Sequence, residues 1–293
     1  MPEEKPVLVT GATGNVGRYV VEALLNEGYA VRAAGRTAES VRHAFGDRVD
    51  AVELDFTDST TWPAVFAGVE RLFLMRPPEL GKPKSQMLPA LEYAKSAGVR
   101  QMVFLSLQGA DKNKIVPHAA IEQWLKSAAG VDYTFIRASF FMQNLSTTHA
   151  ADIRDRNEIM IPAGNGATAF VDASDVAAVA AKALIDPDGN RNLAWTPTGP
   201  EALTYEQVST ILSTVLGRHI HYTRPNLFRF ALYARKTLKM PWGFVAVTCV
   251  IYTIARIGKA GGLTDDVQTV TGRVPITFVE FAERERTAWE RQP

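Results

Sequence analysis

The residues of this chain that are best suited to chemistry stand near its start, where three glycines follow one another at intervals of three. An apolar run over residues 7–9 leads into Gly11, Gly14 and Gly17, and a run with helical spacing continues to Gly28. The first glycine permits a tight turn, the second lets the backbone approach a phosphate, and the third lets a helix pack on the strand, with free N–H groups facing the anion. The pattern predicts a turn for a dinucleotide pyrophosphate, with a purely structural turn as the alternative. The expected contact residues are Gly11, Thr13, Gly14, Asn15 and Val16.

The residue after the second expected strand bears on the identity of the dinucleotide. That strand covers residues 29–34, and Gly35-Arg36-Thr37 follows it. An NAD-preferring site has an acidic side chain there for the ribose hydroxyls, whereas a guanidinium can bind a 2′-phosphate and stack on adenine. Arg36 therefore predicts NADP(H) as the preferred cofactor. NAD(H) stays an alternative, because Arg36 could also be a solvated loop residue.

Length and composition fit an enzyme-sized globular chain. Of the 293 residues, 46% are hydrophobic and 22% are charged, so a sizeable core needs no disulfide. Cys249 is the single cysteine, which excludes a disulfide within the chain. No apolar signal segment precedes the first expected strand, and a cytoplasmic location is expected.

Apolar runs with strand and helix periodicity alternate through the first two thirds of the chain. This alternation predicts an α/β fold, a Rossmann-type doubly wound parallel sheet, whose ligands lie beyond the carboxyl ends of the strands. Further strands are expected over residues 49–54, 71–75, 101–106 and 133–137, and helices over 38–44, 61–67, 86–97 and 119–129.

The pattern loosens from about residue 190, which predicts a smaller C-terminal α+β cap region. A helix with a capping-box start is expected over residues 204–216, a short strand over 219–222 and a closing helix over 278–291. The predicted domains are a cofactor-binding domain over residues 1–195 and a substrate or cap region over 196–293. Residues 151–170 are a candidate for interleaving with the cap.

A basic, aromatic segment over residues 218–259 stands out within this cap. No acidic residue lies between Glu206 and Asp265, while eight basic ones do. The favoured interpretation is a cap over an apolar pocket, and peripheral contact with a membrane surface or an acidic protein partner is the alternative. The uncharged run over residues 240–255 is shorter than the roughly 20 residues of a spanning helix.

Several motifs together make the chain resemble the NmrA-like group of the atypical short-chain dehydrogenase/reductase superfamily. The resemblance implies a Rossmann domain, a C-terminal substrate region and NADP(H) binding. Some members of the group are similar to quinone reductases, and others are similar to redox-sensing regulators that do not turn the cofactor over. The motifs lie at residues 10–17, 54–58, 104–110, 117–122, 133–145, 271–275 and 278–281.

The same resemblance implies further site residues, each of which could instead pack or cap a strand end. Asp55 and Phe56 would lie beside adenine, and Met75 and Arg76 would follow the cofactor. The residues implied near the nicotinamide and its ribose are Ser106, Leu107, Gln108 and Phe140. The residues expected to line an apolar substrate pocket, from family pattern, position and residue type, are Phe141, Asn144, Phe170, Trp242 and Tyr252.

The chain lacks the Tyr-x-x-x-Lys dyad with which most short-chain reductases protonate a developing alkoxide. At the corresponding helix stand His118 and Glu122, one turn apart, which could serve as a proton donor and its orienter or as a plain polar pair. Quinone reduction needs less acid catalysis than ketone reduction, because the product oxyanion is a weakly basic phenolate.

The leading hypothesis is therefore an NADPH-dependent reductase of quinone-like or other activated carbonyl acceptors. The alternative is a non-catalytic NADP(H)-binding redox sensor that acts through a protein partner. The five histidines show no convincing metal spacing, and no helix-turn-helix or zinc signature predicts nucleic-acid binding.

Overall fold

The computed structural model describes residues 5–114 and 116–291, and these fold into two compact units. The first unit consists of the chain up to Ala138 together with Ala173–Pro197 and Asp266–Arg273. The second unit consists of Ser139–Asp172, Thr198–Asp265 and the chain from Val274 onward. Each unit is therefore assembled from segments that are far apart in the sequence.

A seven-stranded, all-parallel sheet forms the centre of the first unit, in the order β10-β6-β5-β4-β1-β2-β3. This arrangement confirms the predicted Rossmann-type fold. The strands are β1 (Val7–Thr10), β2 (Val31–Gly35), β3 (Asp50–Glu53), β4 (Arg71–Met75), β5 (Gln101–Leu107), β6 (Asp132–Ala138) and β10 (Leu193–Trp195).

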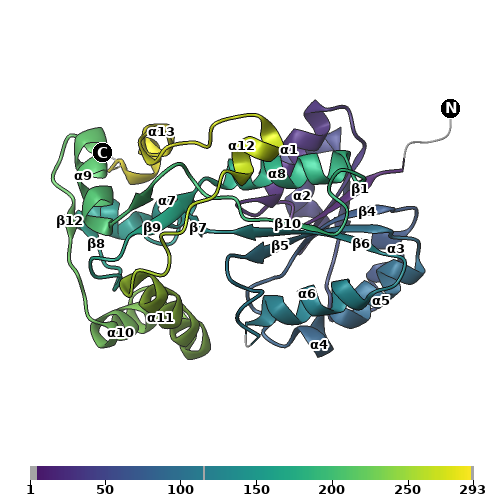
Figure 1. Cartoon of the computed structure of the whole chain (residues 1–293), viewed down its shortest axis with the longest axis horizontal. Helices are drawn as coiled ribbons and strands as arrows, with labels where there is room; N and C mark the ends of the chain where they lie inside the picture. The colour runs from purple at the N-terminus through teal and green to yellow at the C-terminus, as the bar shows by residue number, and fades with distance from the viewer. Residues whose placement is uncertain (1–4, 115, 292–293) are drawn as a thin grey trace. The chain divides into compact units, whose positions relative to one another are not determined.

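Helices cover both faces of this sheet (Figure 1). One face carries α1 (Gly17–Asn26), α2 (Ala38–Phe45), α8 (Ala173–Ile185) and α12 (Asp266–Thr271). The other carries α3 (Trp62–Phe66), α4 (Pro83–Gln86), α5 (Leu88–Ser96) and α6 (Pro117–Ser127). Because both faces are covered, the central strands are apolar throughout: all four residues of β1 and the middle three of β4 are buried.

One expected helix of this unit begins two residues later than predicted. The periodicity predicts a helix over residues 86–97, which the structure contains as α5, while Gln86 is the last residue of the short α4 before it. Pro89 has no N–H to donate and its ring clashes with the preceding turn, so it fits the first turn of a new helix and not the middle of an old one.

The second unit contains two small sheets and five α-helices among its described residues. The strand pairings are β11-β9-β7 and β12-β8, formed by β7 (Phe140–Phe141), β8 (Glu158–Ile159), β9 (Thr168–Val171), β11 (Ala202–Leu203) and β12 (His221–Tyr222). The helices are α7 (Gln143–Ser146), α9 (Tyr205–Leu216), α10 (Leu227–Lys236), α11 (Trp242–Arg256) and α13 (Phe278–Arg284).

Local signals explain the ends of two of these helices. Thr204 caps α9 and Thr277 caps α13, each through a complete capping box. The expected closing helix over 278–291 is shorter in the structure, because α13 ends at Arg284 and a 3₁₀ turn, Arg286–Trp289, follows. That turn places Trp289 in the core, where its indole N–H donates to the Leu145 carbonyl at 2.8 Å.

The two units interleave more than the expected boundary after residue 195 implies. Strand β9 pairs with both β7 and β11, so residues 139–172 fold with the second unit. Helix α12 packs against α8, so residues 266–273 return to the first unit. Both differences come from pairings between segments remote in sequence, which local periodicity does not encode.

Within the described ranges, no helix combines the length and the apolar character that crossing a bilayer requires.

Candidate functional site

The glycine-rich turn of the first unit is fixed to three neighbouring strands. Thr10, at the end of β1, donates from Oγ1 to the Phe73 carbonyl at 3.0 Å and accepts from the Met75 N–H at 2.8 Å. The Ala12 N–H donates to the Ala34 carbonyl of β2 at 3.1 Å. The turn is therefore held at the carboxyl end of the sheet, where α/β folds bind ligands.

A side chain would clash with backbone at Gly17, would be strained by the positive φ at Gly11 and would be tightly placed at Gly14. A Cβ on Gly17 would lie 2.2 Å from the Gly11 carbonyl oxygen, and one on Gly14 would lie 3.1 Å from the same atom. Gly11 has a φ of +61°, and a Cβ there would lie 2.2 Å from Cε of Met75. The backbone of the turn thus forms a tight cradle, and residues larger than glycine at these positions would widen it.

The helix that follows has an N-terminus suited to an anion. No side chain caps α1, and its first turn contains no acidic residue. The N–H groups of Arg18 and Tyr19 donate to the carbonyls of Gly14 and Val16, so the positive end of the helix dipole is the feature of this start that favours an anion. Thr13 is exposed, Asn15 is partly exposed and Val16 is buried beneath the turn. The cradle and the helix start together fit a pyrophosphate.

Arg36 lies directly after β2, on the neighbouring strand end, and its side chain is exposed. It forms no ion pair with any residue that the structure describes. The next residue, Thr37, caps α2 by accepting from the Ser40 N–H at 3.2 Å. The capped helix fixes the backbone at Arg36, while its guanidinium stays available to a phosphate.

Asp55 and Phe56 form a turn after β3. Oδ1 of Asp55 accepts from both the N–H and the hydroxyl of Thr57 at 2.7 Å. Phe56 is 5% exposed and packs in the core of the first unit. The ring of Phe56 is therefore a packing residue in this structure, and Asp55 is the more accessible of the two.

Met75 ends β4 and Arg76 follows it, and both side chains contact the backbone around them. The Met75 side chain packs on Gly11. The Nη1 of Arg76 donates to the carbonyls of Pro77, Pro78 and Leu80 at 2.8–3.1 Å. Burial lowers the pKa of Arg76, and the nearby Glu79 acts in the opposite direction. Arg76 thus secures the loop after β4.

A buried carboxylate network joins β5, α6 and β6. Glu122, which is 2% exposed, accepts from the Ser106 hydroxyl at 2.7 Å and from Arg137 Nε at 3.0 Å and Nη2 at 2.7 Å. Asp111 lies 3.8 Å from Arg137. The neighbouring Leu107 is partly buried, and the Gln108 N–H donates to the Ala138 carbonyl at 3.0 Å. This network fixes the end of β5.

The expected pair of His118 and Glu122 is not formed. The carboxylate of Glu122 is occupied by Ser106 and Arg137, and the Nδ1 of His118 is buried without a partner among the described residues. Burial, aided by the positive charge of Arg76, lowers the pKa of His118 to about 3. His118 is therefore neutral near pH 7, and Glu122 does not orient it.

Replacing His118 by Asn is expected to flatten the acid limb of the stability curve. Between the ordinary value of 6.5 and about 3, the unfolded chain binds a proton at His118 that the folded protein does not, so the free energy of unfolding falls as the pH falls. The variant should lose about 2 kcal/mol less than the wild type between about pH 7 and pH 5. Urea unfolding at both pH values measures this difference. The exposed His43→Asn is the control, and parallel curves for His118→Asn and wild type would refute the prediction.

The other residues expected at the site belong to the second unit. Phe140, Phe141 and Asn144 are partly exposed, with Phe140 and Phe141 in β7. Trp242, at the start of α11, is 57% exposed. These residues thus lie on two segments of the second unit that are about a hundred residues apart.

Phe170 and Tyr252 are core residues of the second unit instead of exposed pocket residues. The ring of Phe170 packs edge-to-face on Tyr205 at 5.4 Å between centroids. Tyr252 packs edge-to-face on Phe230, and its hydroxyl lies 3.1 Å from Nε2 of His149. These contacts explain the burial of both aromatic rings by packing within the unit.

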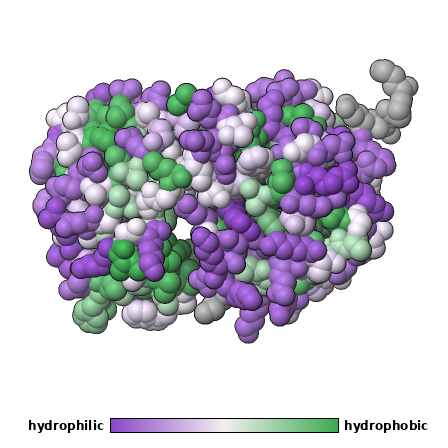
Figure 2. Space-filling view, viewed as in Figure 1, coloured by the Kyte–Doolittle hydropathy of each residue, from purple (hydrophilic) through white to green (hydrophobic). Residues whose placement is uncertain are grey.

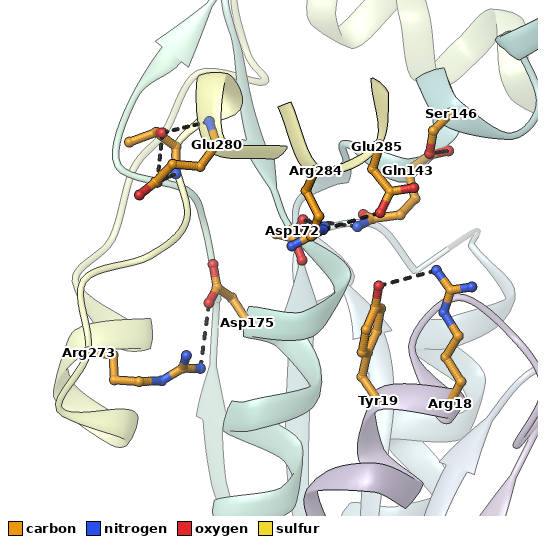
Figure 3. A network of polar contacts seen from close by, with 11 residues as sticks. Arg18, Tyr19, Gln143, Ser146, Asp172, Asp175, Arg273, Glu280, Arg284 and Glu285 are labelled. Atoms are coloured by element: carbon orange, nitrogen blue, oxygen red, sulfur yellow. Dashed lines mark hydrogen bonds and ion pairs between the residues drawn. The ribbon is translucent and has the colours of Figure 1, made fainter. Parts of the chain in front are cut away.

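Sequence reasoning missed two carboxylates that become fully buried after β9. Asp172 accepts from Arg284 at 2.6 Å and from Gln143 at 3.0 Å within the second unit (Figure 3). In the first unit, Asp175 lies 3.7 Å from Arg273. The only local signal was a pair of acids at the start of a predominantly apolar helix.

Comparisons with known proteins agree with this arrangement. The model of the NmrA-like family matches residues 3–232. The NAD(P)H azoreductase of Xenophilus azovorans is 34% identical over 290 residues, which span 97% of this chain and 99% of that protein.

Solved structures share the fold of this chain. A crystal structure of the NADPH-dependent quinone oxidoreductase QOR2 from Escherichia coli is 25% identical, with a TM-score of 0.80 over 95% of this chain and 98% of that one. The Citrobacter triphenylmethane reductase complexed with NADP(H) shares the fold, with a TM-score of 0.80 at 22% identity over 96% of this chain and 99% of that one. With its glycine cradle at the end of a seven-stranded parallel sheet, this chain belongs to the NmrA-like family.

Proposed function

We propose that this protein is an NADPH-dependent reductase that transfers hydride to a flat, activated acceptor of the quinone or azo type. The observation that carries the proposal is the backbone cradle of Gly11, Gly14 and Gly17 against an uncapped helix start, with the exposed Arg36 on the next strand end. The relatives named above as NAD(P)H azoreductase and NADPH-dependent quinone oxidoreductase support the reaction class.

Each part of the first unit has a definite task in this proposal. The N–H groups around Gly14 bind the pyrophosphate, and Arg36 binds the 2′-phosphate. Asp55 accepts from the exocyclic amine of adenine, and Met75 packs beneath the turn. The residues assigned to the nicotinamide half are Ser106, Leu107 and Gln108 of the first unit, together with Phe140, which belongs to the second unit. When bound, NADPH supplies the hydride.

Acceptor recognition is proposed to belong to the second unit. Phe141, Asn144 and Trp242 retain exposed surface there and offer aromatic area and one amide to a flat acceptor. Phe170 and Tyr252 support these side chains from the core. The proposed division is a cofactor domain over residues 1–195 and a substrate region over 196–293. Residues 139–172 fold with the substrate region, and residues 266–273 fold with the cofactor domain.

The chain does not require a strong general acid when the acceptor is a quinone. Tyr133 and Arg137, which have the spacing of the missing dyad, lie on one strand, with Tyr133 stacked on Phe135 and Arg137 bound to Glu122. Reduction of a quinone by hydride gives a phenolate, which takes its second hydrogen as a proton from water. Positioning of the acceptor then supplies most of the rate enhancement.

Replacing Arg36 by Ala is expected to weaken NADPH binding about 10- to 100-fold, because bonds to a charged phosphate contribute about 1.5–3 kcal/mol. NADH affinity should change little, since NADH lacks the 2′-phosphate. Fluorescence titration with both cofactors measures the two constants. Arg42→Ala, on the exposed side of α2, is the matched control. An equal loss for NADPH and NADH would show that Arg36 does not select the phosphate.

The direct test is NADPH oxidation with a panel of quinones and azo dyes, at equal concentrations of protein and cofactor. Acceptor-dependent loss of the fluorescence of bound NADPH is the expected result. Tight binding of NADPH without hydride loss for any acceptor would contradict the reductase.

A redox sensor is the second candidate function. It is favoured by the neutral, unpaired His118 and the commitment of Glu122 to Arg137, which leave no acid–base pair at the end of β5. In that case a protein partner should bind with an affinity that depends on the NADPH/NADP ratio, and a pull-down at two ratios would show the difference.

A further inference from the structure

Helices α10 and α11 pack side by side in the second unit and expose a continuous set of large apolar side chains. Figure 2 shows apolar residues gathered where Figure 1 draws these two helices. We call this surface the α10–α11 face, and it consists of Phe228, Val247, Val250, Ile251, Ile254 and Ile257, which are 38–74% exposed.

The spacing along α11 shows that this exposure is systematic. Val247, Val250, Ile251 and Ile254 recur at i, i+3, i+4 and i+7, so they form one stripe of the helix. The opposite side of α11 is buried through Val245, Tyr252 and Ala255. A surface helix normally has a polar outer stripe, and this one is apolar on both sides. An exposed apolar stripe of this kind indicates a surface that binds another molecule.

The segment that forms the α10–α11 face contains no Asp or Glu from residue 207 to 264, and the acidic Asp152 that accepts from the Tyr233 hydroxyl of α10 is buried. Arg229 and Lys236 lie on α10, and Lys239 and Lys259 lie before and after α11. All four side chains are exposed, and none of them forms an ion pair with a residue the structure describes. An apolar stripe bordered by unpaired cations matches a surface with anionic groups above an apolar layer.

We propose that the α10–α11 face docks peripherally on an anionic lipid bilayer. Helix α11 has 15 residues, fewer than the roughly 20 of a spanning helix, and both its ends lie among basic residues. It therefore lies in the plane of the interface, with Val250 and Ile254 in the acyl boundary and the cations at the headgroups. This docking does not rest on the reductase activity.

Co-sedimentation of the full chain with vesicles tests the docking. Binding to phosphatidylcholine vesicles that contain phosphatidylglycerol should exceed binding to phosphatidylcholine alone, and it should fall as salt rises. The triple variant R229Q/K236Q/K239Q is expected to bind at least tenfold more weakly, since each cation near the surface contributes about fivefold. The double variant V250E/I254E should abolish sedimentation.

Val279→Glu is the matched control, because Val279 is also an exposed apolar residue of the second unit, on α13, away from the α10–α11 face. Circular dichroism and NADPH titration without vesicles confirm that each variant is folded and separate this test from that of the reductase. Vesicle binding that ignores phosphatidylglycerol, or that V250E/I254E leaves intact, would overturn the proposal. An absence of vesicle binding would also overturn the proposal. If light scattering then finds a dimer that V250E/I254E dissociates, the α10–α11 face joins two copies of the chain instead.

Discussion

Replacing Arg137 by Met is expected to lower the free energy of unfolding by about 3–5 kcal/mol, because it leaves the buried Glu122 carboxylate without its counter-charge. Glu122 is 2% exposed, and Arg137 supplies two of the three hydrogen bonds that it accepts. Methionine fills a similar volume, so the loss should come from the charge and not from a cavity. Urea unfolding at neutral pH measures the effect.

Two further variants identify the cause of this loss. The double variant E122Q/R137M should recover a large part of the stability, because a neutral amide can keep the bond to Ser106 without a buried charge. Arg191→Met, which breaks the ion pairs of the exposed Arg191 with Asp188 and Asp132, should change stability little. If E122Q/R137M is no more stable than Arg137→Met alone, the buried charge is not the cause.

Replacing Gly17 by Ala is expected to reduce NADPH affinity about 10- to 100-fold, since forcing an extra carbon into packed backbone costs about 1–3 kcal/mol. Its Cβ would lie 2.2 Å from the Gly11 carbonyl oxygen and 2.8 Å from the carbonyl carbon, so α1 and the turn must separate. That separation moves the backbone N–H groups that would donate hydrogen bonds to the pyrophosphate. Fluorescence titration measures the affinity, and thermal unfolding measures the accompanying loss of stability.

Gly81→Ala is the matched control for this variant. Gly81 also lies in the first unit, its φ is not positive, and no atom lies within 4 Å of an added Cβ. Gly81→Ala should bind NADPH like the wild type. Unchanged NADPH affinity in Gly17→Ala would mean that the turn is a structural element and not the cofactor cradle.

The two carboxylates that sequence patterns assign to the site illustrate how position in the chain differs from role. Asp55 stays exposed after β3 and remains open to a ligand, although Oδ1 also bonds Thr57. Glu122 is buried, and its hydrogen bonds go to β5 and β6. Helical spacing placed Glu122 next to His118, but the bidentate guanidinium of Arg137 is the stronger partner for a buried carboxylate.

Local sequence patterns were sufficient to predict the fold class and the glycine-rich turn. Strand and helix periodicities are local, so alternating runs were sufficient to predict β1 to β6 and their crossover helices. The glycine spacing was sufficient for the cradle, because the steric demand at Gly17 comes from Gly11, six residues away. Arg36 could be singled out for the same reason, since its position follows from the end of β2.

The hydrogen-bond partners of the polar side chains became known from the folded arrangement. Arg137 of β6 reaches Glu122 of α6, and β10 and β9 join their sheets through segments that carry no strong periodic signal. The outward direction of the α11 stripe is likewise invisible in a sequence that is apolar all round, because burial of Val245 and Tyr252 fixes which side faces out. Contacts between residues remote in sequence depend on the folded positions of whole elements, and local patterns contain no information about them.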